Sequence, residues 1–185
     1  MGEKRSKELI AIESATDVFS RFGYARTTMG DIAAKAGMSR PALYLLFPDK
    51  QAAFDRVIAE MDRRTLGEIA AVLPTLKGLE AKLLHACEAW GLHGVELAAV
   101  HPDSADLFDL RFPAVQRVYA NFQTLIAELI ADAARCSQVG VDAAEIARVL
   151  VYGLRGLREG ASDVEDMRQM IAVHVATFAR ALKAD

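Results

Sequence analysis

The segment over residues 27–50, TTMGDIAAKAGMSRPALYLLFPDK, constrains the fold more than any other part of this chain. Its first half places apolar residues on one helical face at the spacing i, i+3, i+4 and i+7: Met29, Ile32, Ala33 and Ala36. Gly37 can end this helix in the left-handed conformation that most residues avoid. Ser39 can then cap a second helix, whose first turn tolerates Pro41. The pattern predicts two short helices joined by a tight turn.

The start of this segment carries a further helix signal. Thr28 is a favourable N-cap residue, and Asp31 stands three positions later, where a capping box has Glu or Gln. Two helices joined at a steep angle by a short turn form a helix-turn-helix, which lays its second helix in the major groove of DNA. We therefore expect this segment to read DNA.

The same segment, with the residues just before it, resembles the TetR family of transcriptional regulators. The resemblance covers residues 1–60 of the chain. The positions that carry it are Phe22-Gly23, Thr27-Thr28, Asp31-Ile32-Ala33, Ala36-Gly37-Met38-Ser39, Leu43-Tyr44, Phe47 and Lys50. It implies an all-α protein of about nine helices, in which a small DNA-binding head is joined by its fourth helix to a helical body that binds an effector and dimerises.

Composition and charge agree with this organisation. The chain has 185 residues, of which 52% are hydrophobic and five are proline, and it shows almost no β-branched alternation, which favours an all-α fold. The formal net charge is −3, but residues 1–50 hold eight Lys and Arg against six Asp and Glu. A slightly basic end on an acidic body fits a DNA-binding domain over residues 1–50 and a ligand-binding and dimerisation domain over residues 51–185.

Caps, breakers and apolar periodicity predict the other helices. The first is expected from Ser6 to Phe22, and Gly23 is the residue that stops it. Those after the motif are expected over residues 50–72, 79–100, 104–110, 113–136, 142–158, and from a capping box at Ser162–Glu165 to Lys183. No apolar run is long enough to span a membrane, and we expect a cytoplasmic protein with no membrane partner.

Two side chains suit contacts with DNA phosphates. They are the phenol of Tyr44 on the second helix of the motif and the ammonium group of Lys50 at the start of the next helix. The resemblance implies a DNA contact at Tyr44, whereas the residue type alone also allows a core aromatic of a three-helix head. Thr28 can cap its helix and contact phosphate at the same time.

Base reading is expected from the exposed front of the second helix, at Ser39, Arg40, Ala42 and Leu45. Arg40 can make a bidentate contact with guanine, worth roughly 1–3 kcal/mol of discrimination, or it can contact phosphate without reading sequence. Ala42 and Leu45 offer apolar contact alone, for example to a thymine methyl group. The family often has a polar residue at the position of Ala42 and an aromatic residue or His at that of Leu46.

Leu46 either removes one backbone contact of the family or packs into the head, and basic residues near the N-terminus and Arg26 are expected to add affinity for the operator. They are Lys4, Arg5, Lys7 and Arg26. The same residues can equally form a solvated tail.

A single helix-turn-helix reads few base pairs, so we expect a homodimer on a palindromic operator. The last two predicted helices are the expected interface, because they carry more apolar residues than one buried face requires. Mid-helix glycines there would cost stability unless another helix approaches closely. The interface residues are Val149, Gly153, Gly156, Met170, His174 and Phe178.

Aromatic and amphipathic residues of the middle helices have the composition of an apolar cavity for a small-molecule effector. They are Trp90, His93, Phe108, Phe112, Tyr119, Phe122 and Tyr152, and they can equally fill an ordinary core. His85, His93 and Glu96 lack the spacing of metal ligands, so no metal or other cofactor is expected. Cys87 and Cys136 are expected to be reduced core thiols, with a redox sensor as the alternative.

These patterns predict a transcriptional regulator, and specifically a repressor that a small molecule releases from its operator. Effector binding would move the helix over residues 50–72 and change the spacing of the two DNA-reading heads. An enzyme is not expected, because the chain has no GxSxG, P-loop, dinucleotide-binding or paired Glu-x-x-His motif. A helical scaffold with a vestigial head is the other alternative, which Ala42 and Leu46 keep open.

Overall fold

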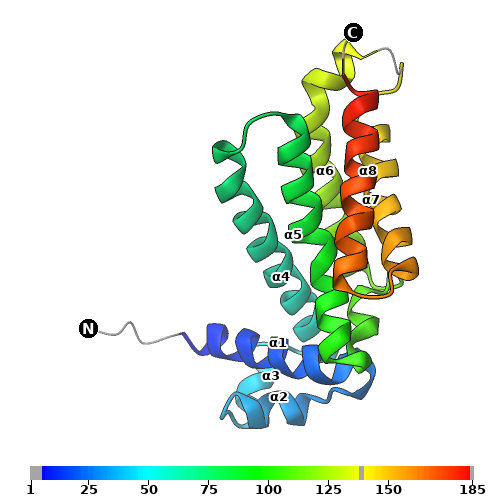
Figure 1. Ribbon diagram of the computed structural model, residues 1–185. Coiled ribbons are helices and arrows are strands. Elements are labelled where there is room, and N and C mark those ends of the chain that lie inside the picture. Colours follow the sequence, from blue (N-terminus) through cyan, green and yellow to red (C-terminus); the bar gives the residue numbers. More distant parts are fainter. Residues whose placement is uncertain (1–5, 138–139, 184–185) are drawn as a thin grey trace. The chain divides into compact units, whose positions relative to one another are not determined.

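In the computed structural model, which describes residues 6–137 and 140–183, all regular secondary structure is helical (Figure 1). The predicted all-α fold is therefore confirmed. The elements in chain order are α1 (Lys7–Arg26), α2 (Met29–Lys35), α3 (Arg40–Tyr44), α4 (Lys50–Val72), the 3₁₀ segment η1 (Leu73–Thr75), α5 (Leu79–Val100), the 3₁₀ segment η2 (Pro102–Phe108), α6 (Pro113–Cys136), α7 (Ala143–Gly160) and α8 (Val164–Ala181). Contacts divide the chain into a first unit, residues 1–63 with 100–116, and a second unit, residues 64–99 with 117–185.

The first unit has an apolar core to which each of its α-helices contributes. Its buried side chains include Ala15 and Phe19 of α1, Ile32 and Ala33 of α2, Leu43 of α3, and Phe54 and Val57 of α4. The rings of Phe19 and Phe54 meet edge to face with 5.4 Å between their centroids. The ring of Phe54 also lies 4.9 Å from Tyr24 and 4.7 Å from Phe112. Because aromatic pairs add about 0.5–1.5 kcal/mol beyond their buried area, this cluster binds α1, α4 and the segment after η2 together.

Helix α1 is interrupted at Gly23, whose φ of 70° and ψ of 175° are not helical. The backbone N–H groups of Tyr24 and Ala25 that follow both donate to the carboxylate of Asp106 in η2, each over 2.9 Å. Asp106 lies 82 residues beyond Tyr24 in the chain. We call this pair of hydrogen bonds the Asp106 clasp. It attaches residues 100–116 to the end of the first helix.

In the second unit, α5, α6, α7 and α8 run side by side (Figure 1). Gly91 of α5 allows α8 to come close, since a Cβ there would lie 3.2 Å from Cδ1 of Ile171. His174 of α8 places its Nε2 atom 3.0 Å from the carbonyl oxygen of Leu150 in α7. These contacts join α5 to α8 at Gly91 and α8 to α7 at His174.

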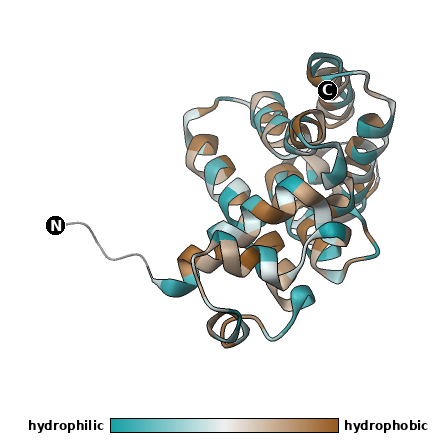
Figure 2. Ribbon diagram, turned by 90° about the horizontal axis from the view of Figure 1, so that it is seen from below, coloured by the Kyte–Doolittle hydropathy of each residue, from teal (hydrophilic) through white to brown (hydrophobic). Residues whose placement is uncertain are grey.

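Hydropathy varies around and along the helices, as expected for amphipathic elements that bury one face (Figure 2). Within the parts of the chain that the structure describes, no helix is both long enough and apolar enough to cross a membrane.

Local sequence signals placed most helix ends correctly, and three details differ. The segment expected as a helix over residues 104–110 is the 3₁₀ segment Pro102–Phe108. Gly23 does break the first helix, but a further turn follows it to Arg26. The cap of α8 is Asp163, which accepts from the N–H of Asp166 over 2.8 Å, and not Ser162. Because α8 begins at Val164, the N-cap position falls one residue later than predicted.

Alanine substitution at Gly23 tests the contact between α1 and η2. A Cβ at Gly23 would lie 2.2 Å from the carbonyl oxygen of Asp103, and its backbone conformation is one that is almost confined to glycine. Gly37 is a matched control, because its φ is 62° but no atom lies within 4 Å of an added Cβ. We expect Gly37→Ala to lower the free energy of unfolding by about 1–2 kcal/mol and Gly23→Ala to lower it by about 3 kcal/mol or more, measured by urea denaturation. Equal losses would contradict the close packing of η2 on α1.

Candidate nucleic-acid interface

Helices α2 and α3 form the motif, and a side chain holds the start of each. The hydroxyl oxygen of Thr28 accepts from the N–H of Asp31 over 3.2 Å, and Asp31 accepts from the N–H of Thr28 over 2.9 Å, so the predicted capping box is present. The hydrogen bond from the Thr28 hydroxyl is the main cause that lowers the pKa of Asp31, followed by the one from the Thr28 N–H. Ser39 caps α3 by accepting from the N–H of Ala42 over 3.3 Å.

Burial on one side of α3 decides which residues face outward. Leu43 and Phe47 lie one helical turn apart and are fully buried in the first unit. Tyr44 and Leu45, between them, are 48% and 88% exposed. The alternative in which Tyr44 fills the core of the head is therefore wrong, and both side chains are accessible to a partner.

Arg40 folds back across α2. A Cβ added to Gly30 would lie 2.5 Å from Nη2 of Arg40, so the missing side chain of Gly30 makes room for the guanidinium group. The charge of Arg40 is also close enough to Asp31 to contribute to its lowered pKa, as the smallest of the causes. The guanidinium group thus lies over the first turn of α2 rather than in front of α3.

Two predicted phosphate contacts have partners within the first unit. The ammonium group of Lys50 donates to the carbonyl oxygens of Tyr24 over 3.0 Å and Ala25 over 3.5 Å, and it lies 4.4 Å from the centroid of the Tyr24 ring. Arg26 forms an ion pair with Asp103 at 2.6 Å, with both side chains exposed. Lys50 therefore holds the end of α1, and Arg26 faces η2.

The other predicted DNA contacts are distributed around the motif. Thr28 and Ser39 are exposed at the starts of α2 and α3, and Ala42 is half-buried. Lys4 and Arg5 lie outside the described residues. A contact with DNA stays a prediction for every one of these positions.

Sequence reasoning missed two residues that shape this surface. Asp106 is far from Tyr24 in the chain, and no local pattern indicates that it accepts from backbone N–H groups of α1. Gly30 did carry a signal, because glycine inside a helix costs stability and often marks a close approach by another group. Here that group is the Arg40 side chain.

Four of the seven residues predicted to bind an effector form an aromatic cluster in the second unit. The ring of Trp90 stacks on Phe122 at 4.5 Å and meets Tyr119 edge to face at 5.0 Å, and Tyr119 lies 5.7 Å from Tyr152. Burial is the largest cause that raises the pKa of Tyr119. The other three do not join this cluster: His93 is exposed on α5, and Phe108 and Phe112 belong to the first unit.

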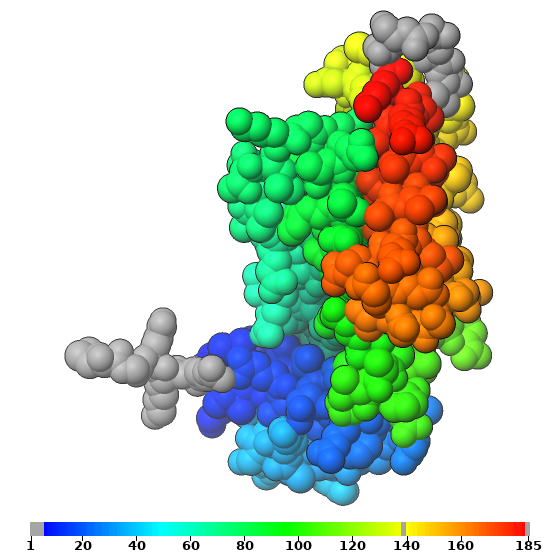
Figure 3. Space-filling view, in the orientation of Figure 1, coloured from blue at the N-terminus to red at the C-terminus, as the bar shows by residue number. Residues whose placement is uncertain are grey.

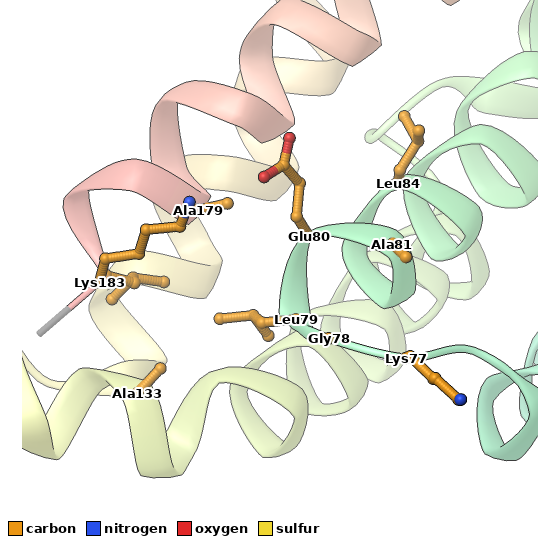
Figure 4. A pocket seen from close by; sticks show the side chains of 10 residues that line it. Lys77, Gly78, Leu79, Glu80, Ala81, Leu84, Ala133, Ala179 and Lys183 are labelled. Atoms are coloured by element: carbon orange, nitrogen blue, oxygen red, sulfur yellow. The ribbon is translucent and has the colours of Figure 1, made fainter.

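A hollow of about 650 Å³ lies elsewhere in the second unit, where the loop before α5 meets α6 and the end of α8. Apolar side chains line it, among them Leu79, Leu84 and Leu182. Figure 4 shows Glu80 and Lys183 on two sides of this hollow. No residue of the aromatic cluster is part of its lining.

The two cysteines have different surroundings. Cys87 is buried, and burial, with the charge of Glu88, raises the pKa of its thiol to about 12. Such a thiol stays protonated and unreactive near neutral pH. Cys136 is exposed, so the expectation of a core thiol is wrong for this residue. Within the described ranges, no group of three His, Cys, Asp or Glu residues is arranged to hold a metal ion.

The predicted dimer residues lie on α7 and α8, and α8 reaches the surface along its length in Figure 3. Val149 of α7 is 62% exposed and Val173 of α8 is 69% exposed. A Cβ at Gly153 would lie 2.5 Å from Cε1 of His174, so this glycine admits a side chain of the same chain. Gly156 has open space beside it.

Met170, His174 and Phe178, the remaining predicted dimer residues, are half-buried along α8. The rings of His174 and Phe178 meet edge to face with 5.0 Å between their centroids. These side chains take part in the packing of their own unit, and an interface role stays a prediction for each of them.

Over its described residues, the chain is helical, and its first unit has the architecture of a helix-turn-helix protein with an outward-facing second helix. Residues 11–57 match the family model described as bacterial regulatory proteins, tetR family. A curated relative, an uncharacterised HTH-type transcriptional regulator named YfiR from Bacillus subtilis, is 39% identical over 56 residues. That match covers 30% of this chain and 26% of the relative.

Solved structures extend the likeness over the remaining helices. The fatty acid degradation regulator FadR from Bacillus halodurans aligns with a TM-score of 0.74 over 100% of both chains at 16% identity. A transcriptional regulator from Cytophaga hutchinsonii gives a TM-score of 0.73 over 92% of this chain and 95% of that chain, at 24% identity. A TetR-family regulator from Pectobacterium atrosepticum gives 0.71 over 96% and 94%, at 21% identity. The helix-turn-helix of this chain is therefore similar in sequence to the tetR family over residues 11–57, and the described helices as a whole share the fold of TetR-family structures.

Proposed function

We propose that this protein is a homodimeric, sequence-specific DNA-binding repressor, released from a palindromic operator by a small molecule bound in residues 51–185. The observation that carries this proposal is the outward face of α3, where Tyr44 and Leu45 are exposed while Leu43 and Phe47 hold the helix in the core. A helix presented in this way can enter the major groove.

The proposed contacts with DNA divide by chemistry. Tyr44 has an exposed hydroxyl-bearing side chain that suits phosphate oxygens. Thr28 donates its hydroxyl to Asp31 over 2.6 Å, so a contact with phosphate requires that this hydroxyl turn away from Asp31. Arg40 brings a cation to the first turn of α2, where it suits phosphate better than a guanine base, because it folds back over Gly30. Lys50 acts mainly by holding the end of α1 beside the motif, through its hydrogen bonds to Tyr24 and Ala25.

The proposed dimer forms through α7 and α8 of two chains. Val149, Tyr152 and Val173 are large hydrophobic side chains left exposed on these helices, and Gly156 leaves room for a neighbour. Apolar side chains grouped on an exposed face are typical of interfaces between subunits. Two copies are also what a palindromic operator requires.

The proposed effector site is the aromatic cluster of the second unit. Its helices α5 and α6 are the two that flank residues 100–116 along the chain. A ligand that displaces these helices therefore pulls on η2, which the Asp106 clasp attaches to α1 of the DNA-binding unit. This connection acts beside α4, which also continues from the first unit into the second.

Binding to DNA is tested by enriching duplexes from a random library and measuring affinity by gel shift at two salt concentrations. We expect the enriched duplex to bind at least about a thousandfold more tightly than a shuffled one. Arg40→Ala should weaken binding and reduce the slope of log affinity against log salt by about 0.9 for each phosphate that is no longer neutralised. Arg135→Ala, which removes another exposed charge, on α6, is the control and should change neither. A chain with no sequence preference at either salt concentration would be a scaffold rather than a regulator.

The dimer is tested by sedimentation velocity at micromolar concentration. We expect the unaltered chain to sediment as a dimer and Val149→Asp and Val173→Asp to sediment as monomers, because a charge buried in an apolar interface is costly. Val100→Asp, at another exposed valine, should leave the dimer intact. A monomeric unaltered chain would contradict the proposed interface.

The effector site is tested through Trp90, the one tryptophan of the chain. Because its ring stacks on Phe122, a ligand that enters the cluster should change its fluorescence. We expect compounds that weaken operator binding, by roughly 5–150-fold, to change this fluorescence over the same concentration range. Compounds that release DNA and leave the emission of Trp90 unaltered would place the effector elsewhere.

A further inference from the structure

Part of the outward side of α3 and of the turn after it is apolar. The N–H of Phe47 donates to the carbonyl oxygen of Leu43, as in an α-helix, so the helical turn continues beyond Tyr44, the last residue of α3. With the side chains of Leu43 and Phe47 buried, the segment exposes three residues whose side chains have no polar atom, Pro41, Leu45 and Pro48, beside the polar residues Arg40, Tyr44 and Asp49. We call Pro41, Leu45 and Pro48 the apolar ridge. None of them has a side chain that can donate or accept a hydrogen bond.

Three polar side chains lie beside the apolar ridge in the chain: Ser39, Arg40 and Tyr44, and all three are exposed. The hydroxyl oxygen of Ser39 accepts from the N–H of Ala42 as the cap of α3, and its one proton can make a single hydrogen bond. The guanidinium group of Arg40 lies over Gly30. Tyr44 has a single hydroxyl group, and the guanidinium group of Arg40 is turned toward α2, so this face has no side chain placed for a bidentate hydrogen bond to guanine.

A base edge in the major groove offers one prominent apolar group, the 5-methyl group of thymine, which distinguishes an A·T pair from the other pairs by contact alone. Leu45 matches this chemistry, since it is branched, apolar and 88% exposed in the free protein. We propose that Leu45, at the centre of the apolar ridge, reads a thymine methyl group in each operator half-site, so that thymine rather than guanine dominates the sequence preference. This inference rests on the proposed DNA-binding function and adds the chemical group that is read.

Deoxyuridine provides the test, because it differs from thymidine by the 5-methyl group alone. Each thymine of the enriched duplex is replaced singly by uracil, and affinity for the full chain is measured by gel shift. We expect at least one position in each half-site where the replacement weakens binding, by about fourfold for one buried methyl group.

Variants at Leu45 connect this effect to the protein. Leu45→Ala should bind the thymine duplex more weakly than the unaltered chain does, and it should bind the thymine and uracil duplexes with equal affinity. Leu45→Met should keep the preference for thymine. Val100→Ala is the matched control, because Val100 is another exposed apolar residue of the first unit, outside the motif. It should behave as the unaltered chain does. Thermal unfolding of all three variants should be unchanged, since both positions are exposed.

The outcomes separate the inference from the proposed function. A chain without any sequence preference overturns both. Two outcomes overturn the reading of thymine by Leu45 and leave the proposed DNA-binding function standing. In one, no uracil substitution weakens binding to the preferred sequence; in the other, the preference for thymine survives in Leu45→Ala. A change in sedimentation of Leu45→Ala in the absence of DNA assigns the apolar ridge to contact between copies of the chain and also overturns it.

Discussion

A five-residue helix cannot keep its shape in water by its own hydrogen bonds, so α3 depends on the burial of Leu43 and Phe47. Because these two side chains enter the core of the first unit, the opposite side of the helix must face outward. The same burial therefore holds the helix in place and decides that Tyr44 and Leu45 are the residues offered to a partner. The cap by Ser39 fixes where the helix begins.

The Asp106 clasp attaches residues 100–116, which are distant in sequence, to α1 of the first unit. Gly23 opens α1, so that two backbone N–H groups become available to the Asp106 carboxylate. The segment that carries Asp106 is covalently continuous with α5 and α6, which supply Trp90 and Tyr119 to the aromatic cluster of the second unit. In the proposed mechanism, this segment carries the effect of a ligand at that cluster along the chain to α1, beside the route through α4 that the family resemblance implies.

The sequence predicted features that depend on neighbouring residues, and it failed where distant residues meet. The capping box at Thr28, the cap at Ser39 and the left-handed Gly37 follow from local chemistry, and all three are present. By contrast, periodicity does not indicate that Lys50 donates to the end of α1 or that Phe112 packs in the first unit. These positions depend on tertiary packing. The sequence pattern is the same for an aromatic residue that binds a ligand and for one that fills the core.

Hydroxyl-radical footprinting of the full chain on an enriched duplex shows whether two copies present their α3 helices to one DNA double helix, as we propose. We expect two protected patches related by two-fold symmetry, with centres one helical turn of roughly 34–36 Å, or a multiple of it, apart. A single protected patch, two patches in the same orientation, or uniform protection along the duplex would contradict this proposal.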